Sequence, residues 1–366
     1  MLTEPNDIRI IGCLREEKAM KCIVFAAAMN AVFMASTASL AQTASWAVPP
    51  ESARCPSKWG VGDERGSGNL MKPQVVLDAI KLIKTGEVID LAYVLGAGMP
   101  FFGQRRFDVH LKRTFMNPQS NERGSNEEMV LSEIGQVGTQ LDGFAHQSHR
   151  NSHYNCFKTD EIATRTGFTK LGIENVPAFI TRGVLIDIAG YKGVDMLGDS
   201  YEITVDDVQG ALKKQNLTLK AGDAVIIHTG WGKLYGKDNA RFVKSCPGIG
   251  VKAAEWLISQ NPVLLGSDNW PVEVAPNPDP QISLPVHQIA LVVNGVHLLE
   301  NLKLDELVAK NVQEFAFIMT PLKIRGATGS TVSPIRGVES RLLSRMSPAR
   351  SRPLYAIPPR WARPNS

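Results

Sequence analysis

The sequence predicts a mixed α/β fold, and three observations support that prediction. The chain of 366 residues is long enough to bury a full hydrophobic core. Its 31 Gly and 22 Pro favour many turns, which suits a strand-rich or mixed fold better than a helical bundle. Short apolar runs are interspersed with segments of helical periodicity, without a regular βαβ alternation. We therefore expect a single domain of catalytic size.

Residues 1–41 have the pattern of a secretory signal. Two lysines precede the apolar run 22–34, and small residues at 39–41 suit a signal peptidase. That run is shorter than the ~20 residues of a bilayer-spanning helix, and a buried N-terminal helix is the alternative. Met20 is a candidate for the true start. We expect a periplasmic or secreted protein in which residues 42–58 form a linker.

The net charge of +4 originates in the C-terminal end of the chain. Residues 331–366 carry seven Arg and one Glu, which exceeds the whole net charge and leaves the preceding body slightly acidic. An acidic body gives no support for binding nucleic acid, because phosphate recognition needs a basic face. No later run is apolar and long enough for a membrane span, so we expect no membrane partner after signal cleavage. We expect 336–366 to be an Arg-rich disordered tail.

Three cysteines, Cys55, Cys156 and Cys246, follow the signal segment. Their odd number cannot pair completely within one chain, and their spacing fits no zinc pattern. One disulfide in an oxidising compartment and three free thiols are both consistent with the sequence.

Periodicity and turn residues assign the secondary structure of the body in order. Thr204 is the expected N-cap of one helix, with Asp206 and Asp207 in its first turn, where negative charge suits the helix dipole. A polar stretch at 117–128 is expected to separate a turn-rich loop at 100–105 from the next strand. The expected elements are helix 73–84, strand 88–95, strand 129–141, strand 183–188, helix 204–214, strand 224–228, helix 251–259, strand 263–266 and strand 289–293.

The densest group of unusual polar residues lies at the end of the third of these segments. If 134–142 is extended, the side chains of Gln136, Gln140 and Asp142 point to one face, because strand side chains alternate. Gly138 on the same face leaves room for an ion or a substrate. The spacing alone is equally typical of a polar edge strand.

The same stretch resembles the signature His-x-Gly-Thr-His-x-Asp-x-x-x-His of the cyclase family, which includes bacterial kynurenine formamidases and isatin hydrolase. The matching residues are Gly138, Thr139, Asp142 and His146, whereas Gln136 and Gln140 occupy the positions of the two metal-binding histidines. Further similar landmarks follow the family order and are Trp59–Asp63, Gly68–Leu70, Thr229–Trp231, His287 with Glu300–Leu302, and Gly326–Ser330. The resemblance covers 59–335 and implies the family's swivelling β/β/α fold with a mixed curled sheet, and a homo-oligomer.

The resemblance also implies a metal site. Asp142, His287 and Glu300 would bind one divalent ion, and His146 would be the catalytic acid and base. Gln136 and Gln140 stand at the family's other metal position, where neutral amide oxygens are weaker ligands for Zn²⁺ than imidazoles. We therefore expect one ion, Zn²⁺ or Mn²⁺. The amides could instead hydrogen-bond a substrate carbonyl.

The reaction implied by the resemblance is hydrolysis of a carbon–nitrogen bond in an amide, formamide or lactam, as in kynurenine formamidase and isatin hydrolase. Candidates for packing a small aromatic substrate are Trp59, Phe101, Phe102 and Trp270, although each is equally typical of a core or rim residue. Two alternatives stay open. The chain could be a small-molecule binding protein that kept the pocket without the chemistry, or a ring-forming cyclase or dehydratase.

Overall fold

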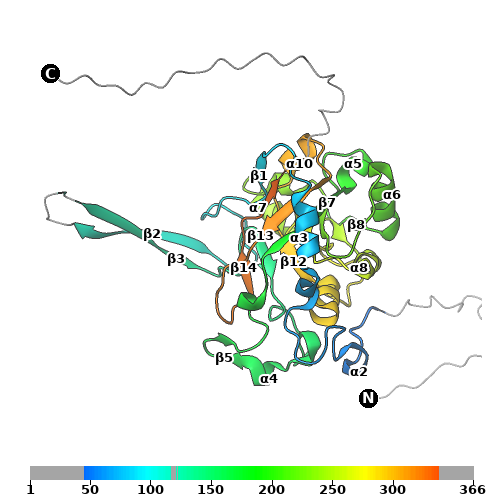
Figure 1. Cartoon of the computed structure of the whole chain (residues 1–366), viewed down its shortest axis with the longest axis horizontal. Coiled ribbons are helices and arrows are strands. Elements are labelled where there is room, and N and C mark those ends of the chain that lie inside the picture. The colour runs from blue at the N-terminus through cyan, green and yellow to red at the C-terminus, as the bar shows by residue number, and fades with distance from the viewer. Residues whose placement is uncertain (1–44, 117–120, 122, 338–366) are drawn as a thin grey trace, which may run out of the picture. The chain divides into compact units, whose positions relative to one another are not determined.

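The computed structural model describes residues 45–116, 121 and 123–337 (Figure 1). All described residues except Ser45 belong to one unit of the chain. The predicted signal segment therefore lies outside the described residues, as does the predicted tail apart from Arg336 and Gly337. No helix among the described residues is long and apolar enough to cross a membrane.

A curled mixed sheet forms the centre of this unit. Four neighbouring strands, β7, β9, β11 and β12, run parallel, and the strands outside them are antiparallel to their neighbours. Among the described residues the sheet has nine strands, in the order β1 (Val88–Asp90), β15 (Ile335–Gly337), β13 (Glu314–Met319), β7 (Phe179–Asp187), β9 (Ala224–His228), β11 (Leu264–Ser267), β12 (His297–Glu300), β4 (Gln140–Asp142) and β14 (Gly329–Thr331).

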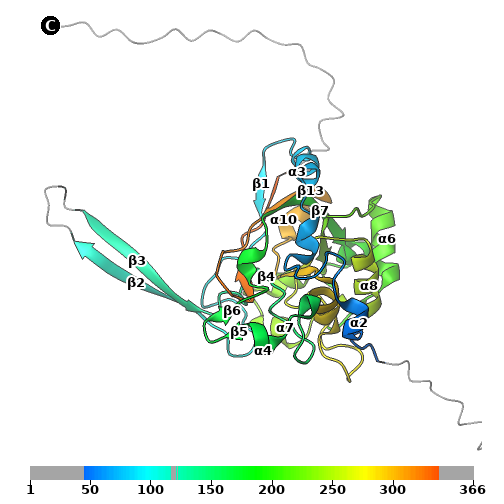
Figure 2. The ribbon, with the colours of Figure 1, turned by 60° about the horizontal axis from the view of Figure 1, so that its bottom comes forward.

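Short helices and two small strand pairs surround the sheet (Figure 2). The α-helices are α2 (Glu51–Arg54), α3 (Pro73–Ile80), α4 (Thr159–Ile162), α5 (Ile188–Lys192), α6 (Val205–Gln215), α7 (Asn239–Lys244), α8 (Val251–Ser259), α9 (Pro285–His287) and α10 (Asp305–Ala309). The 3₁₀ helices are η1 (Gly66–Leu70), η2 (Tyr154–Cys156), η3 (Ile173–Asn175) and η4 (Trp231–Leu234), and η5 (Gln288–Asn294) is a π-helix. The small pairs join β5 (Ala163–Thr164) to β6 (Gly167–Phe168) and β8 (Glu202–Ile203) to β10 (Gly248–Ile249).

Alternating side chains of the central strands build two cores, one on each face of the sheet. In β9, Val225 and Ile227 belong to a cluster that contains the buried faces of α6, α8 and η5. Ala224 and Ile226 point the other way, into a cluster that includes Leu307 of α10. This period of two is the expected pattern for a sheet covered on both faces.

Several predicted elements are confirmed and others are wrong. The strands at 183–188, 224–228 and 263–266 and the helices at 204–214 and 251–259 are present within two residues of their predicted bounds or inside a longer element. Thr204 caps α6 through a capping box with Asp207. Helix 73–84 ends early at Ile80, and strand 88–95 ends at Asp90. The segment 289–293, predicted as a strand, belongs to the helix η5. The prediction was wrong because a short apolar run that is mostly buried does not reveal whether its period is that of a strand or of a helix.

The largest difference lies between residues 107 and 142. There β2 (Phe107–Met116) pairs antiparallel with β3 (Gly124–Ser132) in one hairpin, and β3 joins the end of the predicted polar spacer to the start of the predicted strand 129–141. This hairpin extends away from the sheet in both views (Figures 1 and 2), and several of its apolar side chains are exposed. Turns at 134–139 then separate β3 from the three-residue strand β4, so 134–142 is not one extended strand.

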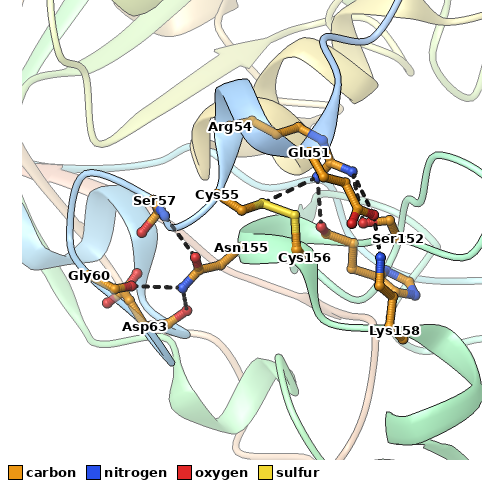
Figure 3. The surroundings of a disulfide bond; sticks show 11 residues. Glu51, Arg54, Cys55, Ser57, Gly60, Asp63, Ser152, Asn155, Cys156 and Lys158 are labelled. Carbon is orange, nitrogen blue, oxygen red and sulfur yellow. Dashed lines mark hydrogen bonds and ion pairs between the residues drawn. A yellow bond between two sulfur atoms is a disulfide. The ribbon is translucent and has the colours of Figure 1, made fainter.

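The N-terminal part of the described chain is fastened by a disulfide between Cys55 and Cys156 (Figure 3). Beside it, the buried guanidinium of Arg54 donates to Ser152 Oγ at 2.8 Å and to the carbonyl of His153. Asn155 bonds the backbone of the facing 57–63 loop. The predicted linker 42–58 thus contains helix α2 and half of a disulfide, while Cys246 is a buried free thiol.

Candidate active site

Four of the predicted site residues converge on the face of the sheet that carries η5. Asp142 and Gln140 lie on β4, and Glu300 ends β12, where it is the register partner of Gln140. Glu300 is thus the last residue of a strand. His287 ends α9, which leads into η5. Residues far apart in sequence are therefore brought together by strand pairing and by the helix above the strands.

Three of these residues meet around one small space. His287 Nε2 lies 3.6 Å from Asp142 Oδ2 and 3.4 Å from Glu300 Oε1. The side chains of all three are less than a tenth exposed. Asp142, His146 and His287 also each offer a ligand atom within 4.8 Å of the others. His287 and Asp142 thus belong to two overlapping sets of donors, one completed by Glu300 and the other by His146.

The charge of Asp142 has no compensating hydrogen bond. Its side chain is fully buried, and within the described part of the chain neither carboxylate oxygen has a hydrogen-bond partner. A buried carboxylate in that state is costly unless a cation or a donor neutralises it. The orphaned oxygens beside an imidazole and a second carboxylate are therefore the arrangement expected of a divalent cation site.

Glu273 holds His287 in place, and the sequence analysis did not identify it. Its buried carboxylate accepts a bond from His287 Nδ1 at 2.6 Å and from the backbone N–H groups of Val286 and His287 at the start of α9. A carboxylate at Nδ1 fixes the tautomer and turns Nε2 toward Asp142 and Glu300. Glu273 is thus the outer partner of a candidate ligand.

The pKa values of Glu300 and His287 are shifted by burial and by the neighbouring carboxylates. Burial raises the pKa of Glu300 to about 7, and the charge of Asp142 adds to this, although the bond to His287 opposes it. For His287, burial lowers the pKa, but bonds to Glu273 and Glu300 outweigh it and raise the value well above the usual one. Three carboxylates around one imidazole favour the binding of a positive ion.

His146 lies at the more open side of this group. The turn after β4, closed by a bond from its backbone N–H to Gly143, returns it toward Asp142, with Nε2 3.9 Å from Asp142 Oδ2. Its side chain is 18% exposed, so it is the member of the group best placed to meet a substrate. Burial lowers the pKa of His146 against the opposing charge of Asp142, and the positive charges of His287 and Arg105 act in the same direction as burial.

The two glutamines bond to each other and to Glu300. Gln140 Nε2 donates to Glu300 Oε2 at 2.8 Å and to Gln136 Oε1 at 3.3 Å. The structure therefore brings both residues to the site, and their predicted role as metal ligands stays a prediction. Their recorded bonds are hydrogen bonds from an amide nitrogen, which cannot itself bind a cation.

An aromatic pair lies beside Arg105, whose charge acts on His146 and Glu300. Phe102 stacks on Trp270 with ring centroids 4.7 Å apart, and Phe101 packs in the same hydrophobic cluster. Arg105, which the sequence analysis missed, lies near the Phe102 ring and donates to the carbonyl of Gln136 at 3.1 Å. Trp59 lies in the Ser57–Gly60 turn, with Lys58 Nζ 5.3 Å from its ring centroid. Its predicted role in binding substrate stays a prediction.

The chain is similar to a known protein family and to several solved structures. The family model described as "Putative cyclase" matches residues 89–274. A solved structure of a novel cyclase shares 32% sequence identity, with a TM-score of 0.72, and covers 80% of this chain and 100% of its own. Isatin hydrolase A from Ralstonia solanacearum shares 23% identity, with a TM-score of 0.51, and covers 69% of this chain and 92% of its own. An isatin hydrolase bound to the product analogue thioisatinate shares 22% identity, with a TM-score of 0.53, and covers 73% of this chain and 98% of its own.

No curated protein sequence matches the chain significantly. The two isatin hydrolases, at under 25% identity, show a shared fold only. The family model spans just over half of the chain, and the 32% identical structure extends over four fifths of it. The mixed curled sheet agrees with that assignment. The chain therefore belongs to the cyclase family.

Proposed function

We propose that the protein is a metal-dependent hydrolase that cleaves a carbon–nitrogen bond in an amide, formamide or lactam. The observation that carries the proposal is the buried, unbonded carboxylate of Asp142 beside His287 and Glu300. The fold shared with isatin hydrolases supports the reaction class. Asp142, His287 and Glu300 would hold one Zn²⁺ or Mn²⁺ ion, which in such sites lowers the pKa of a bound water and polarises the substrate carbonyl.

His146 is the proton carrier of this proposal. Its lowered pKa keeps the imidazole neutral near pH 7, so Nε2 can accept a proton from the attacking water and return it to the leaving nitrogen. Glu273 acts on the opposite side, where it keeps His287 Nε2 directed at the two carboxylates. Phe101, Phe102 and Trp270 would pack against an aromatic part of the substrate, and Arg105 adds a positive charge beside Phe102.

Metal content tests the proposal directly. The protein is purified without added metal or a metal-binding tag, and its Zn and Mn are measured by elemental analysis beside Asp142→Ala. About one ion per chain, lost in the variant, is the expected result. The loaded protein is then assayed on aryl formamides and lactams with His146→Ala as the control for chemistry. A wild-type protein that binds neither ion, even after incubation with each, would exclude the proposed mechanism.

A second candidate function is binding of a small molecule without turnover. The hydrogen bonds of Gln136 and Gln140 favour this binding function, because the two side chains bond to each other and to Glu300 at positions where the family has metal ligands. The same His146→Ala variant separates the two functions. A hydrolase loses turnover in the variant, whereas a binding protein without chemistry retains most of its affinity for the bound compound.

A further inference from the structure

The wall of the metal centre contains a chain of amide hydrogen bonds. Gln140 is 2% exposed on β4 and lies directly opposite Glu300 on β12. Its side-chain nitrogen has two acceptors, Glu300 Oε2 at 2.8 Å and Gln136 Oε1 at 3.3 Å. Gln136 Nε2 in turn lies 3.5 Å from Thr328 Oγ1, beside β14. Three neighbouring segments are thus connected at the back of the site.

The partners determine which way the Gln140 amide faces. The amide nitrogen of Gln140, and not its oxygen, faces Glu300, whose Oε2 accepts the hydrogen bond. An N–H donor at 2.8 Å and a cation cannot share the same side of that oxygen. Glu300 Oε2 is therefore committed to the amide, which leaves Oε1 directed at His287 Nε2, 3.4 Å away, on the side of Asp142.

We infer that Gln140 is a positioning residue, supported by Gln136, that orients Glu300 through a neutral donor and restricts the centre to a single ion. The hydrogen bond from Gln140 takes the place of a second cation beside Glu300, because it gives Oε2 a partner and holds the Glu300 side chain in one rotamer. It adds no positive charge, so the remaining ion meets a more negative site. This inference rests on the proposed metal-dependent function and specifies how its site is held.

Loss of the donor provides the first test. Gln140→Met keeps the length of the side chain and removes both N–H groups. Gln136→Met removes the acceptor that supports Gln140 and the amide nitrogen that faces Thr328 Oγ1, and it leaves the donor to Glu300 in place. Gln74→Met, an exposed site on α3, is the matched control. Zn²⁺ and Mn²⁺ affinities are measured by titration calorimetry on variants whose folding is checked by circular dichroism.

We expect Gln140→Met to weaken metal binding by about 10–100-fold, as loss of an outer partner of a ligand does. Gln136→Met should have a smaller effect, and Gln74→Met none. Equal or tighter binding by Gln140→Met would overturn the positioning role. If that variant does not fold, the stoichiometry of a second variant decides.

The second variant is Gln136→His/Gln140→His. The ends of the two side chains lie 3.3 Å apart and one lies 2.8 Å from Glu300, so imidazoles there would offer two strong nitrogen ligands beside a carboxylate. We expect two ions per chain in this variant and one in both the wild type and a surface control, Gln74→His/Gln260→His. If the wild type and the double variant each bind one ion per chain, the inference about Gln140 is overturned and the proposed function is not. A wild type with no ion would overturn the proposed function itself.

Discussion

Glu273 shows how one side chain behind the site decides what a ligand in front can do. Its carboxylate accepts three N–H groups, two from the backbone and one from His287 Nδ1. Glu273→Gln keeps the shape but places an amide N–H against one of those donors. We expect metal affinity to fall about 10-fold or more, measured by titration calorimetry. Glu255→Gln, on the outer side of α8, is the control, and unchanged affinity in Glu273→Gln would contradict this role.

His228 provides a pH-dependent prediction away from the metal centre. It is buried at the end of β9, with Nδ1 2.6 Å from Asp187 Oδ1 and Nε2 3.9 Å from Asp268 Oδ2, and the charge of Asp305 also acts on it. Burial lowers the pKa of His228, but these carboxylates outweigh burial and raise it. A raised folded pKa means that the stabilisation is fully present below the unfolded value of about 6.5 and is lost as pH rises through the folded value.

His228→Asn should therefore lower the melting temperature more at pH 6 than at pH 9. Loss of a buried hydrogen bond to a charged group is worth about 2 kcal/mol, or about 5 °C for a protein of this size. The melting curves are recorded by circular dichroism at both pH values. His110→Asn, an exposed histidine on β2, should show no such difference. An equal loss at both pH values for His228→Asn would mean that the charged imidazole contributes nothing.

The residues of the site divide according to what a sequence can reveal. Asp142 was predicted from the family signature, and His287 and Glu300 were predicted from later landmarks of the same resemblance. The structure places all three around one space. Glu273 and Arg105 were missed, since each acts only through a residue that folding brings near it. The glutamines were recognised as unusual, but the direction of the Gln140 amide depends on pairing of β4 with β12. No spacing along the chain contains that information.

Among the elements, the turn between β3 and β4 places the motif, and Gly138 makes that turn. Its φ of +65° lies in the left-handed region, and an added Cβ would lie 2.3 Å from Leu95 Cδ2. Gly138→Ala should lower the free energy of unfolding by about 2 kcal/mol or more, measured by urea denaturation. Gly198→Ala is the control, because nothing lies within 4 Å of its added Cβ. A Gly138→Ala variant as stable as the control would show that the turn tolerates a side chain.

The elements that sequence periodicity predicted well are those with one buried and one exposed face, or with clear end signals. Helix α6 has a capping box at Thr204 and a left-handed Asn216 at its end, and it was predicted to within one residue. The π-helix η5 has no such contrast, because most of its residues are buried. Hairpin β2–β3 was missed for the opposite reason. Its many charged and polar residues face solvent on both sides, so the alternation that indicates a strand is weak.

At the scale of the whole molecule, the Cys55–Cys156 disulfide joins the N-terminal part of the described chain to the loop that follows the His146 turn. Arg54 and an ion pair between Glu51 and Lys158 connect the same two segments (Figure 3). Disulfides of this kind persist in oxidising compartments, in keeping with the exported location expected from residues 1–41. That location and the expected homo-oligomer stay predictions.

The same disulfide allows a prediction for the stability of the entire unit. It joins residues 101 positions apart, and closing a loop of that length restricts the unfolded chain enough to stabilise the fold by about 2–5 kcal/mol. Cys55→Ser/Cys156→Ser should therefore melt about 10 °C below the wild type, as followed by circular dichroism. A reducing agent should lower the melting temperature of the wild type toward that of the double variant. The same agent should leave the double variant unchanged, because the one cysteine that remains among the described residues, Cys246, is a buried free thiol. A wild type whose melting temperature does not respond to reduction would show that the disulfide does not stabilise the fold.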